Sequence, residues 1–319
     1  MTVVDWRDVA GDVVGSLLLA ERDRTLEQIG WDLARSFSVV EAARQHGELP
    51  GLILLDRRGE ASGWVFFVLA NRMLQIGGLH APTAGGVRGL LQAALQSPEA
   101  GMAHGVSCFL RATSPSLSSA LLRLGFDLHR YDYLDAPLSG AWQAATPAGR
   151  PLTLGDAPHL VRLLARGYAG EPAGRALVPT GRMDEWAGYV GQLLTGPAAG
   201  LWRPDLSLAQ WAPDGTMAAA LVVTEVADRV AHVAQLVVDP AHRRRGVARA
   251  LLAAGGAAAA AHGGGQLTLL VSQANDAALS LYRSMGFGPR AAFVHGLRGP
   301  VPRTVNGVTI RASRLGAVA

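Results

Sequence analysis

Residues 236–252 read LVVDPAHRRRGVARALL, and this run says more about the fold than any other part of the chain. An apolar segment ends at Asp239 and Pro240, three arginines follow, and Gly246 precedes a segment of small and apolar residues. The pattern predicts a buried strand, a basic loop and a helix that begins at Gly246. The first N–H groups of a helix lack partners inside the helix, and the helix dipole favours negative charge beside them.

The composition of this loop favours a diphosphate ligand. Gly246 and Ala248 leave room for a phosphate to approach the main chain, and the preceding arginines supply charged, forked donors. The alternative is an ordinary strand–helix connection with a solvated basic loop. The position of the small residues favours the diphosphate, because they lie where a phosphate would have to reach the main chain. The run is not G-x-x-x-x-G-K-[ST], and no strand is followed by G-x-G-x-x-G. Nucleoside triphosphates and dinucleotides are therefore poorer candidates.

Around this run, the C-terminal half alternates apolar segments of strand length with segments of helical pattern, which predicts a mixed α/β (α+β) fold. Strands are expected at residues 152–154, 206–211, 217–226, 230–238, 267–271 and 290–297, and helices at 156–168, 183–194, 246–262 and 276–285.

The N-terminal half can be laid out in the same order, with strands at residues 52–55, 63–69, 73–79 and 106–111 and helices at 87–95 and 116–124. The helix ends LLRLGF at 121–126 and LYRSMGF at 281–287 match most closely, so a duplication is favoured. Small residues and prolines between the halves indicate a linker. We expect an N-terminal domain at 1–140, a linker at 141–151 and a C-terminal domain at 152–319.

Composition bounds the class of protein. The 319 residues are 49% hydrophobic and 17% charged, which suits two packed domains and excludes a disordered chain. The net charge is +4, and the basic residues are dispersed apart from Arg243–Arg245, so no nucleic-acid partner is expected. The single cysteine, Cys108, lies in an apolar run, where a buried strand residue is favoured over a nucleophile.

Targeting segments are not apparent. Asp5, Asp8 and Asp12 interrupt the apolar residues of the N-terminus, and no apolar stretch reaches the length of a membrane span. We expect a cytoplasmic protein without a membrane partner or a metal, and a monomer or a homodimer.

Two motifs resemble the GNAT superfamily of N-acetyltransferases. Arg243-x-x-Gly246-x-Ala248 matches the signature [Q/R]-x-x-G-x-[G/A], and NDAALSLYRSMGF at residues 275–287 matches the second signature. The resemblance covers roughly residues 152–297, and the doubled layout resembles the tandem GNAT proteins, of which mycothiol synthase is one. It implies two tandem GNAT domains, each a mixed, mostly antiparallel twisted sheet flanked by helices. It further implies an enzyme, an acyltransferase that moves an acetyl group from acetyl-CoA to a primary amine of a small molecule or peptide, by direct attack in a ternary complex.

The resemblance also implies roles for individual residues. The strand end would offer main-chain groups to the pantetheine arm, the basic loop would hold the pyrophosphate, Asn275 would bind CoA, and Tyr282 would lie near the sulfur. The implied cofactor-binding residues are Leu236, Val237, Val238, Arg243, Arg244, Arg245, Gly246, Val247, Ala248, Arg249, Asn275 and Tyr282.

Transfer to an amine needs a neutral nucleophile and a proton for the leaving thiolate. Tyr282 is the expected acid, with a half-buried structural aromatic as the alternative. His232 falls where the resemblance to mycothiol synthase places a glutamate, so it is the candidate base, with a structural histidine as the alternative. Gln235 could only orient a water, and Glu225 is the reserve candidate for the base.

The N-terminal half lacks these groups. Its equivalent loop, residues 80–88, has no arginine cluster, and Leu122 stands where the other half has Tyr282. We therefore expect a degenerate copy without catalysis of its own. The competing interpretations of the whole chain are a CoA-binding regulatory module whose catalytic groups have decayed, and a mycothiol-synthase-like enzyme. Neither the acceptor nor the acyl chain length follows from the sequence.

Overall fold

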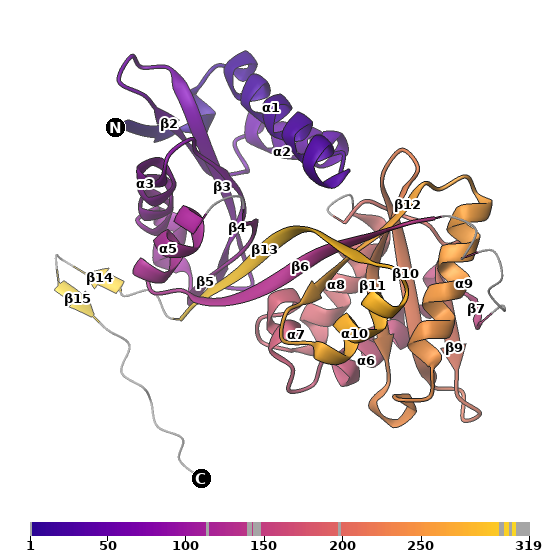
Figure 1. Ribbon diagram of the computed structural model, residues 1–319. Helices are drawn as coiled ribbons and strands as arrows, with labels where there is room; N and C mark the ends of the chain where they lie inside the picture. Colours follow the sequence, from indigo (N-terminus) through magenta and orange to yellow (C-terminus); the bar gives the residue numbers. More distant parts are fainter. Residues whose placement is uncertain are drawn as a thin grey trace, which may run out of the picture. The chain divides into compact units, whose positions relative to one another are not determined.

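The computed structural model describes residues 2–112, 115–138, 142, 148–196, 199–299, 303–305 and 308–310. The chain forms two compact units (Figure 1). The N-terminal unit comprises residues 1–21, 37–130 and 292–319, and the C-terminal unit comprises residues 22–36 and 131–291. Each unit therefore contains a segment from the other half of the sequence.

The N-terminal unit is built on a mostly antiparallel sheet. Its strands follow the order β1 (Thr2–Asp5), β2 (Gly51–Leu55), β3 (Ala61–Ala70), β4 (Met73–His80), β5 (Gly105–Arg111) and β13 (Gly288–Arg298). Only β4 and β5 run parallel among these pairs, with α3 (Ala84–Leu95) and α4 (Pro98–Met102) as the crossover. A short antiparallel pair, β14 (Arg303–Val305) and β15 (Val308–Ile310), follows.

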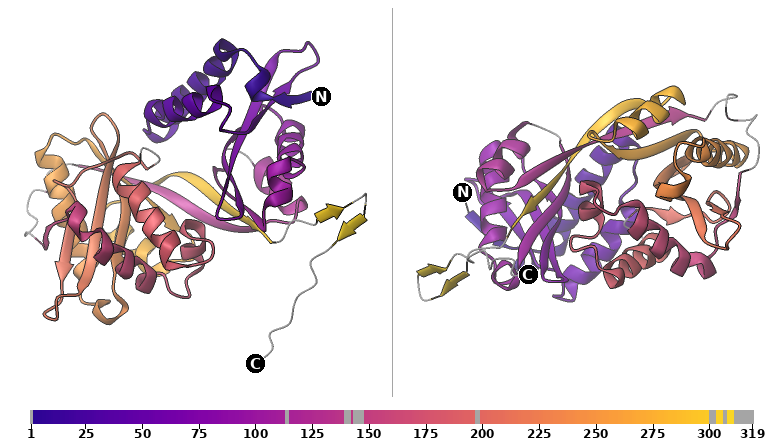
Figure 2. Two further views of the ribbon diagram at one scale, coloured as in Figure 1. Left: turned by 180° about the vertical axis from the view of Figure 1, so that it is seen from behind. Right: turned by 90° about the horizontal axis from the view of Figure 1, so that it is seen from below.

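Helices cover both faces of this sheet (Figure 2). On one face, α3 and α5 (Pro115–Arg123) pack on a core that includes Val65, Phe67 and Leu121. On the other, η1 (Trp6–Asp8), α1 (Gly11–Ile29) and α2 (Ala34–Gln45) pack on Trp6, Ile53 and Trp64.

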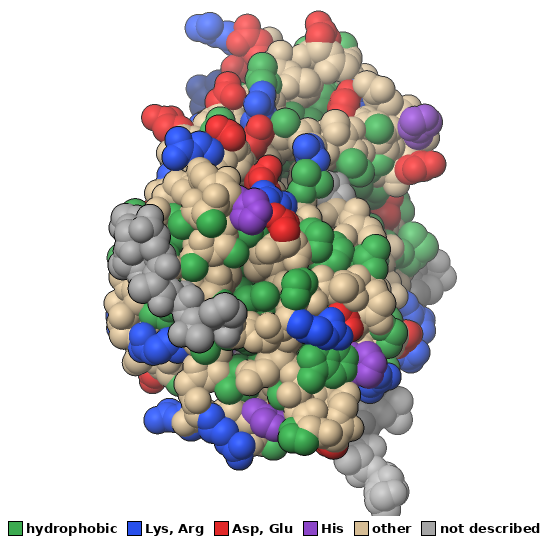
Figure 3. All heavy atoms as spheres, turned by 90° about the vertical axis from the view of Figure 1, so that its right-hand side faces the viewer, with side chains coloured by type: hydrophobic (Ala, Val, Ile, Leu, Met, Phe, Trp, Pro, Cys, Tyr) green, Lys and Arg blue, Asp and Glu red, His purple; other side chains and the backbone are tan. Residues whose placement is uncertain are grey.

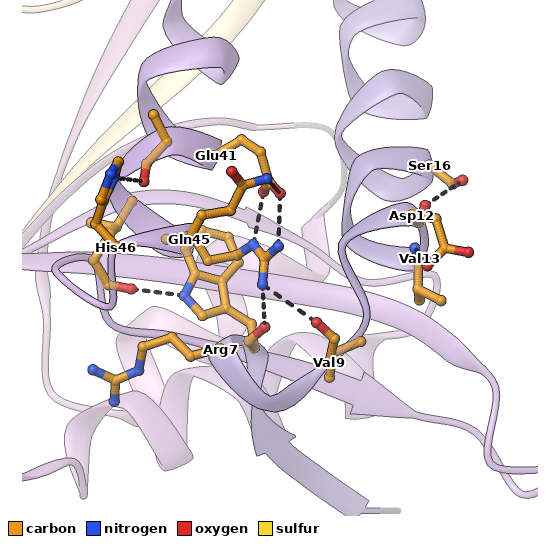
Figure 4. A network of polar contacts seen from close by, with 12 residues as sticks. Arg7, Val9, Asp12, Val13, Ser16, Glu41, Gln45 and His46 are labelled. Atoms are coloured by element: carbon orange, nitrogen blue, oxygen red, sulfur yellow. Dashed lines mark hydrogen bonds and ion pairs between the residues drawn. The ribbon is translucent and has the colours of Figure 1, made fainter.

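A buried arginine ties α2 to the segment before α1 (Figure 4). The Arg44 guanidinium donates to both carboxylate oxygens of Glu41, each at 2.7 Å, and to the carbonyl oxygens of Trp6 at 3.0 Å and Val9 at 3.4 Å. Because its charge is paired and its donors are satisfied, the side chain can be only 5% exposed.

The C-terminal unit has the same kind of sheet. Its strands follow the order β6 (Asp127–Pro137), β12 (Gln266–Ser272), β11 (Val230–Val238), β10 (Met217–Ala227), β9 (Leu208–Trp211) and β7 (Arg150–Pro151), and β8 (Leu201–Trp202) also pairs with β10. Among these strands, β11 and β12 form the parallel pair, and β6 pairs antiparallel with β12 from Gln266–Pro137 to Ser272–Tyr131.

Two cores lie on opposite faces of that sheet. Ala231, Val233, Leu267 and Leu269 point to the face covered by α9 (Val247–Ala261) and α10 (Asp276–Ser284), here called the α9 face. Val237 and Val222 point to the other face, here called the α6 face, and pack with η3 (Leu154–Asp156), α6 (Ala157–Gly167), α7 (Pro172–Leu177) and α8 (Met183–Thr195). The alternation follows from the pleat of a strand.

The mixed α/β fold expected from the sequence is confirmed, and the two units repeat one order of elements. In each, an antiparallel pair (β3–β4 or β10–β11) leads through a helix (α3 or α9) to a strand parallel to the second. The units differ from the expected boundaries because the last strands are exchanged: residues 131–137 of β6 belong to the C-terminal unit, and residues 292–298 of β13 to the N-terminal unit.

The expected linker, residues 141–151, lies mostly outside the described residues, but its described part is packed. Trp142 is 6% exposed, donates to the Pro137 carbonyl oxygen at 3.1 Å, and meets Gly256 of α9 so closely that a Cβ there would lie 2.1 Å from its ring. The strand expected at 152–154 is not found there: the two-residue β7, in which Arg150 and Pro151 pair with β9, ends before it, and η3 begins at Leu154.

Two further observations concern the surface. No described helix is long and apolar enough to cross a membrane. Arginine and acidic side chains are interspersed over the face seen in Figure 3.

Candidate active site

The connection from β11 to α9 forms a concave turn of main chain in the C-terminal unit. Strand β11 ends at Val238, η4 (Pro240–His242) follows, and α9 begins after Gly246. Gly246 has φ +78°, a left-handed conformation that favours glycine. No side chain caps the start of α9, so its first N–H groups are available to a ligand.

This turn borders a cavity of about 790 Å³. Its walls are the β11–α9 connection on one side and one face of α10, along its whole length, on the other. A volume of this size is typical of small-molecule sites. The lining residues are Val238, His242, Arg243, Arg244, Gly246, Val247, Ala248, Arg249, Asp276, Ala277, Ser280, Leu281 and Ser284. Of the residues implied for the cofactor, seven are in this set: Val238, Arg243, Arg244, Gly246, Val247, Ala248 and Arg249.

The arginines of the loop differ in what they contact. Arg243 donates to the carbonyl oxygens of Val238 at 3.2 Å and of Gly167 at 2.7 Å, so its guanidinium holds the loop against β11 and the end of α6. Arg249 donates to the Ser284 hydroxyl and thereby joins α9 to α10. Arg244 has φ +63° and is exposed, as is Arg245, so these two retain their donors for an anion.

Strand β11 carries a bulge beside this cavity. Val223 pairs with Val233 and Val222 with Gln235, so Ala234 is an extra residue. The extra residue keeps Leu236 and Val238 on the α9 face with Val233, while Val237 points to the α6 face. Main-chain pairing of β11 with β12 is found only from Val230–Gln266 to Val233–Leu269, so the two strands part after the bulge.

Gly167 allows the C-terminal end of α6 to approach this strand. A Cβ at Gly167 would lie 2.5 Å from the Val237 side chain, closer than two carbon atoms can come. The missing side chain therefore brings the last turn of α6, and Tyr168 after it, against the bulged part of β11.

Two implied residues on or beside α10 lie outside the cavity wall. Asn275 is the N-cap of α10, and its side-chain oxygen accepts from the Ala278 N–H at 3.1 Å. Tyr282 is 7% exposed in the core of the α9 face, with its ring 5.7 Å from that of Phe287. Within the described residues its hydroxyl has no hydrogen-bond partner, and burial raises the pKa of Tyr282 to about 12.

Residues 178–287 match the model of the acetyltransferase (GNAT) family, and this span contains β11, the Gly246 turn, α9 and α10. The chain carries a GNAT domain. No curated protein matches the sequence significantly. The mycothiol-synthase-like part of the expectation stays a prediction.

The fold of the whole chain is similar to that of several solved structures. A GCN5-related N-acetyltransferase from Sphaerobacter thermophilus aligns with a TM-score of 0.64 and 16% identity, over 93% of this chain and 95% of that one. A tandem GNAT protein from the clavulanic acid biosynthesis pathway aligns with a TM-score of 0.55 and 13% identity, over 79% and 82%. A GNAT-family acetyltransferase from Colwellia psychrerythraea gives 0.54 and 13%, over 94% and 100%.

His232 lies on the α6 face of the GNAT domain, in an aromatic stack. It is 4% exposed, its ring centroid is 4.9 Å from that of Trp31 and 5.9 Å from that of Tyr133, and its Nδ1 shares a hydrogen bond with the Thr268 hydroxyl at 2.9 Å. Burial lowers the pKa of His232 to about 3. The imidazole is therefore neutral and a weak base, which fits the structural alternative better than the catalytic one.

This burial predicts how stability depends on pH. The unfolded chain would protonate His232 near pH 6.5 and the folded one only near pH 3, so its contribution is complete above pH 6.5 and is lost as the pH falls below it. We expect the stability difference between the native protein and His232→Gln to shrink by about 2 kcal/mol from pH 7 to pH 5, in urea unfolding. An unchanged difference would contradict a buried neutral imidazole.

Glu225, the reserve base, lies on β10 opposite Ala231, which points to the α9 face. Its carboxylate accepts from the Arg203 guanidinium at 2.6 Å and is 41% exposed. The seven residue-to-residue steps from Ala231 to Val238 span roughly 23 Å of strand, so Glu225 lies far from the Gly246 turn. We therefore leave it out of the proposed chemistry.

Three residues meet at the bulge: Gln235, which the sequence allowed only to orient a water, and two tyrosines to which it assigned no role. The Tyr168 hydroxyl donates to Gln235 Oε1 at 2.9 Å, and Gln235 Nε2 donates to the Tyr189 hydroxyl. Gln235 is 6% exposed, and Tyr168 stacks on Trp186 with 5.7 Å between the rings. The signal available in the sequence was the polar Gln235 within an apolar strand; its tyrosine partners come from separate helical segments.

The corresponding turn of the N-terminal unit is built differently. Thr83 caps α3, because its hydroxyl accepts from the Gly86 N–H at 3.1 Å, and no arginine precedes it in the loop. Leu122, at the position of Tyr282, is 57% exposed. Cys108 is buried in β5, and burial raises the pKa of its thiol to about 12, which leaves it protonated.

Proposed function

We propose that this protein is an N-acetyltransferase that moves the acetyl group of acetyl-CoA to a primary amine of a small molecule or peptide. The observation that carries the proposal is the uncapped start of α9 at Gly246, which opens onto the cavity of about 790 Å³. The GNAT domain supports acyl transfer in general; the donor, the acceptor and the mechanism belong to the proposal.

The residues around the cavity fit a CoA diphosphate. The free N–H groups at the start of α9 and the exposed guanidinium group of Arg244 supply donors and positive charge. Arg245 is exposed in the same loop but does not line the cavity. Arg243 contributes by holding the loop, through the carbonyl oxygens of Gly167 and Val238. Val238 marks the point where the cavity reaches the parted end of β11.

Acetyl-CoA supplies the thioester, and the remaining steps fall to the chain. Tyr282, with a pKa of about 12, is protonated throughout the physiological range and can give its proton to the departing thiolate. With His232 buried and Glu225 remote, we assign no side chain as the base. The amine must then reach the thioester already neutral. As the amide forms, the nitrogen loses one proton to water, and Tyr282 regains from water the proton that it gave to the thiolate.

The second candidate function is a CoA-binding regulatory module without turnover. The neutral, buried state of His232 favours it, because the expected base is not available. Release of CoA in the presence of an amine panel separates the two functions: binding of acetyl-CoA without release on any acceptor would support the module.

The Gly246 turn gives a binding test with an internal control. Gly246→Ala forces a side chain into φ +78°, at a cost of about 1–2 kcal/mol, and places a methyl group at the turn. We expect acetyl-CoA affinity, measured by calorimetry, to fall at least about tenfold, which is about 1.4 kcal/mol.

Gly215→Ala is the matched control. Gly215 has φ +79° in the turn between β9 and β10, and a Cβ there would meet nothing within 4 Å, as at Gly246. Both variants should lose similar stability, but only Gly246→Ala should lose affinity. Equal affinities would remove the Gly246 turn from the proposed site.

A further inference from the structure

The α6 face of the C-terminal unit presents a set of aromatic residues where β11 and β12 part. Tyr131 pairs with Ser272 at the end of β12, so it lies on the face opposite Val271 and Leu269. Tyr133, further back on the same strand, is stacked on His232 and is not part of this set. Gln235, just after the bulge, lies on this face with Val237. The end of α6 adds Tyr168, and α8 adds Tyr189 and Trp186.

Contacts place two of these tyrosines beside Gln235 at this point. The Tyr168 hydroxyl donates to Gln235 Oε1 at 2.9 Å, and Gln235 Nε2 donates to the Tyr189 hydroxyl. Burial raises the pKa of Tyr168 above its usual value of 10, so its phenol is neutral at physiological pH. The Tyr168–Gln235–Tyr189 network thus lies just after the bulge of β11, where its main-chain pairing with β12 has ended.

The charges around this point would not attract a cation. Arg243 acts electrostatically on Tyr168 and is positive. On the same face, Asp135 is paired with Arg290 at 3.3 Å, and Arg166 with Asp239 at 2.7 Å. The other charged groups of the surrounding segments are exposed, paired or bonded to main chain: Glu171 and Arg175 are exposed, the half-buried Glu185 accepts from the Thr180 N–H at 3.1 Å, Asp184 is paired with Arg182, and Asp32 is paired with Arg22.

An alkylamine is a poor match for such a surface. With a pKa near 10.4, only roughly 1 part in 2,500 of it is neutral at pH 7. The charged form would have to leave water for a place beside the positive Arg243, where each carboxylate of the described segments is exposed, paired or bonded to main chain. An amine that is already neutral in water has no charge to transfer out of water and no proton to lose before it binds.

We infer, on the basis of the proposed function, that the acceptor is a weakly basic amine carried on an aromatic ring, which packs against the tyrosines at the end of β11. The Tyr168–Gln235–Tyr189 network is a specificity-determining group in this arrangement. Gln235, neutral and held at both ends of its amide, keeps the two tyrosines in place without introducing charge.

The test compares three amines with the full-length protein and acetyl-CoA, following CoA release. The probes are 4-methoxyaniline, 4-methoxybenzylamine, which is cationic at pH 7, and methoxyamine, which is neutral but lacks a ring. We expect kcat/KM for 4-methoxyaniline to exceed the other two at least about tenfold at pH 7. For 4-methoxybenzylamine it should rise about tenfold per pH unit toward its own pKa, since only the neutral form reacts. Equal or better use of 4-methoxybenzylamine at pH 7 would overturn the inference, and equal use of methoxyamine would overturn its aromatic part.

A charge substitution tests the role of Gln235. Gln235→Glu keeps the shape but offers a carboxylate to both tyrosines and to a cation. The ratio of kcat/KM for 4-methoxyaniline to that for 4-methoxybenzylamine should fall at least about tenfold, with acetyl-CoA affinity unchanged. Gln210→Glu makes the same change at an exposed position of β9 and should leave the ratio unchanged.

Failure of the inference differs from failure of the proposed function. Acetyl-CoA binding with turnover of 4-methoxybenzylamine alone would keep the acetyltransferase and reject the aromatic acceptor. The absence of any acetyl-CoA binding in calorimetry would reject both. The comparison of amines needs no substitution, so it holds even if Gln235→Glu does not fold.

Discussion

Phenylalanine in place of Tyr282 is expected to lower kcat by about 10²–10⁴, the usual contribution of a general acid, with little change in acetyl-CoA affinity. The ring would stay against Phe287, at 5.7 Å, so packing is kept and only the hydroxyl is lost. Because burial holds the pKa of Tyr282 near 12, its hydroxyl is protonated at neutral pH and is the proton donor. Phenylalanine has no proton to donate. Steady-state CoA release with the best acceptor, together with calorimetry, measures both quantities.

Tyr133→Phe is the matched control for this substitution. Tyr133 is also buried in the C-terminal unit, and burial likewise raises its pKa to about 12, but it packs on His232 away from α10. Removing the Tyr133 hydroxyl should lower kcat too, but by a factor at least about ten times smaller than removing the Tyr282 hydroxyl. If Tyr282→Phe turned over at the native rate, the acid would have to be another group.

A chain that begins at Arg150 is expected not to fold cooperatively, although it contains the whole span that matches the GNAT family. It lacks β6, which pairs with β12 from Gln266–Pro137 to Ser272–Tyr131, and Leu134 and Ala136, which are 3% and 1% exposed in the core. It also lacks Trp31, which packs on His232. The exposed edge of β12 and the unfilled core each lower the free energy of unfolding by several kcal/mol. The total is comparable with the whole stability of a domain.

Urea unfolding followed by near-UV circular dichroism measures this loss. A chain that begins at Asp127 keeps β6 and Trp142, and should recover a cooperative transition while remaining less stable than the full-length protein. If the chain that begins at Arg150 unfolded cooperatively at the same urea concentration as the full-length protein, β6 would contribute nothing to the stability of the C-terminal unit.

The local elements around the diphosphate turn were predictable because their signals lie within a few residues. A glycine before the helical pattern indicates the left-handed residue that Gly246 is, and the apolar run before Asp239 predicts the extent of β11. The predicted helices at 183–194 and 276–285 differ from α8 and α10 by one residue each, at the C-terminal end. Periodicity and glycine placement act locally, so the sequence reports them directly.

Partners distant in sequence could not be predicted in this way. Nothing near Trp31 or Tyr133 indicates that they enclose His232, so its depressed pKa was not foreseen. Arg243 looked like a phosphate ligand, but 76 residues separate it from the Gly167 carbonyl group that its guanidinium holds. Strand β6 was not assigned, because a strand with several charged residues has a weak alternating pattern.

The exchange of β6 and β13 between the units has a consequence for synthesis on the ribosome. The N-terminal unit places residues 293–298 beside β5, so its sheet stays incomplete until β13 has been synthesised. At 5–20 residues per second, the roughly 180 residues between β5 and this part of β13 take about 9–36 s. During that time β5 presents an open edge, the feature by which nascent chains on neighbouring ribosomes associate wrongly.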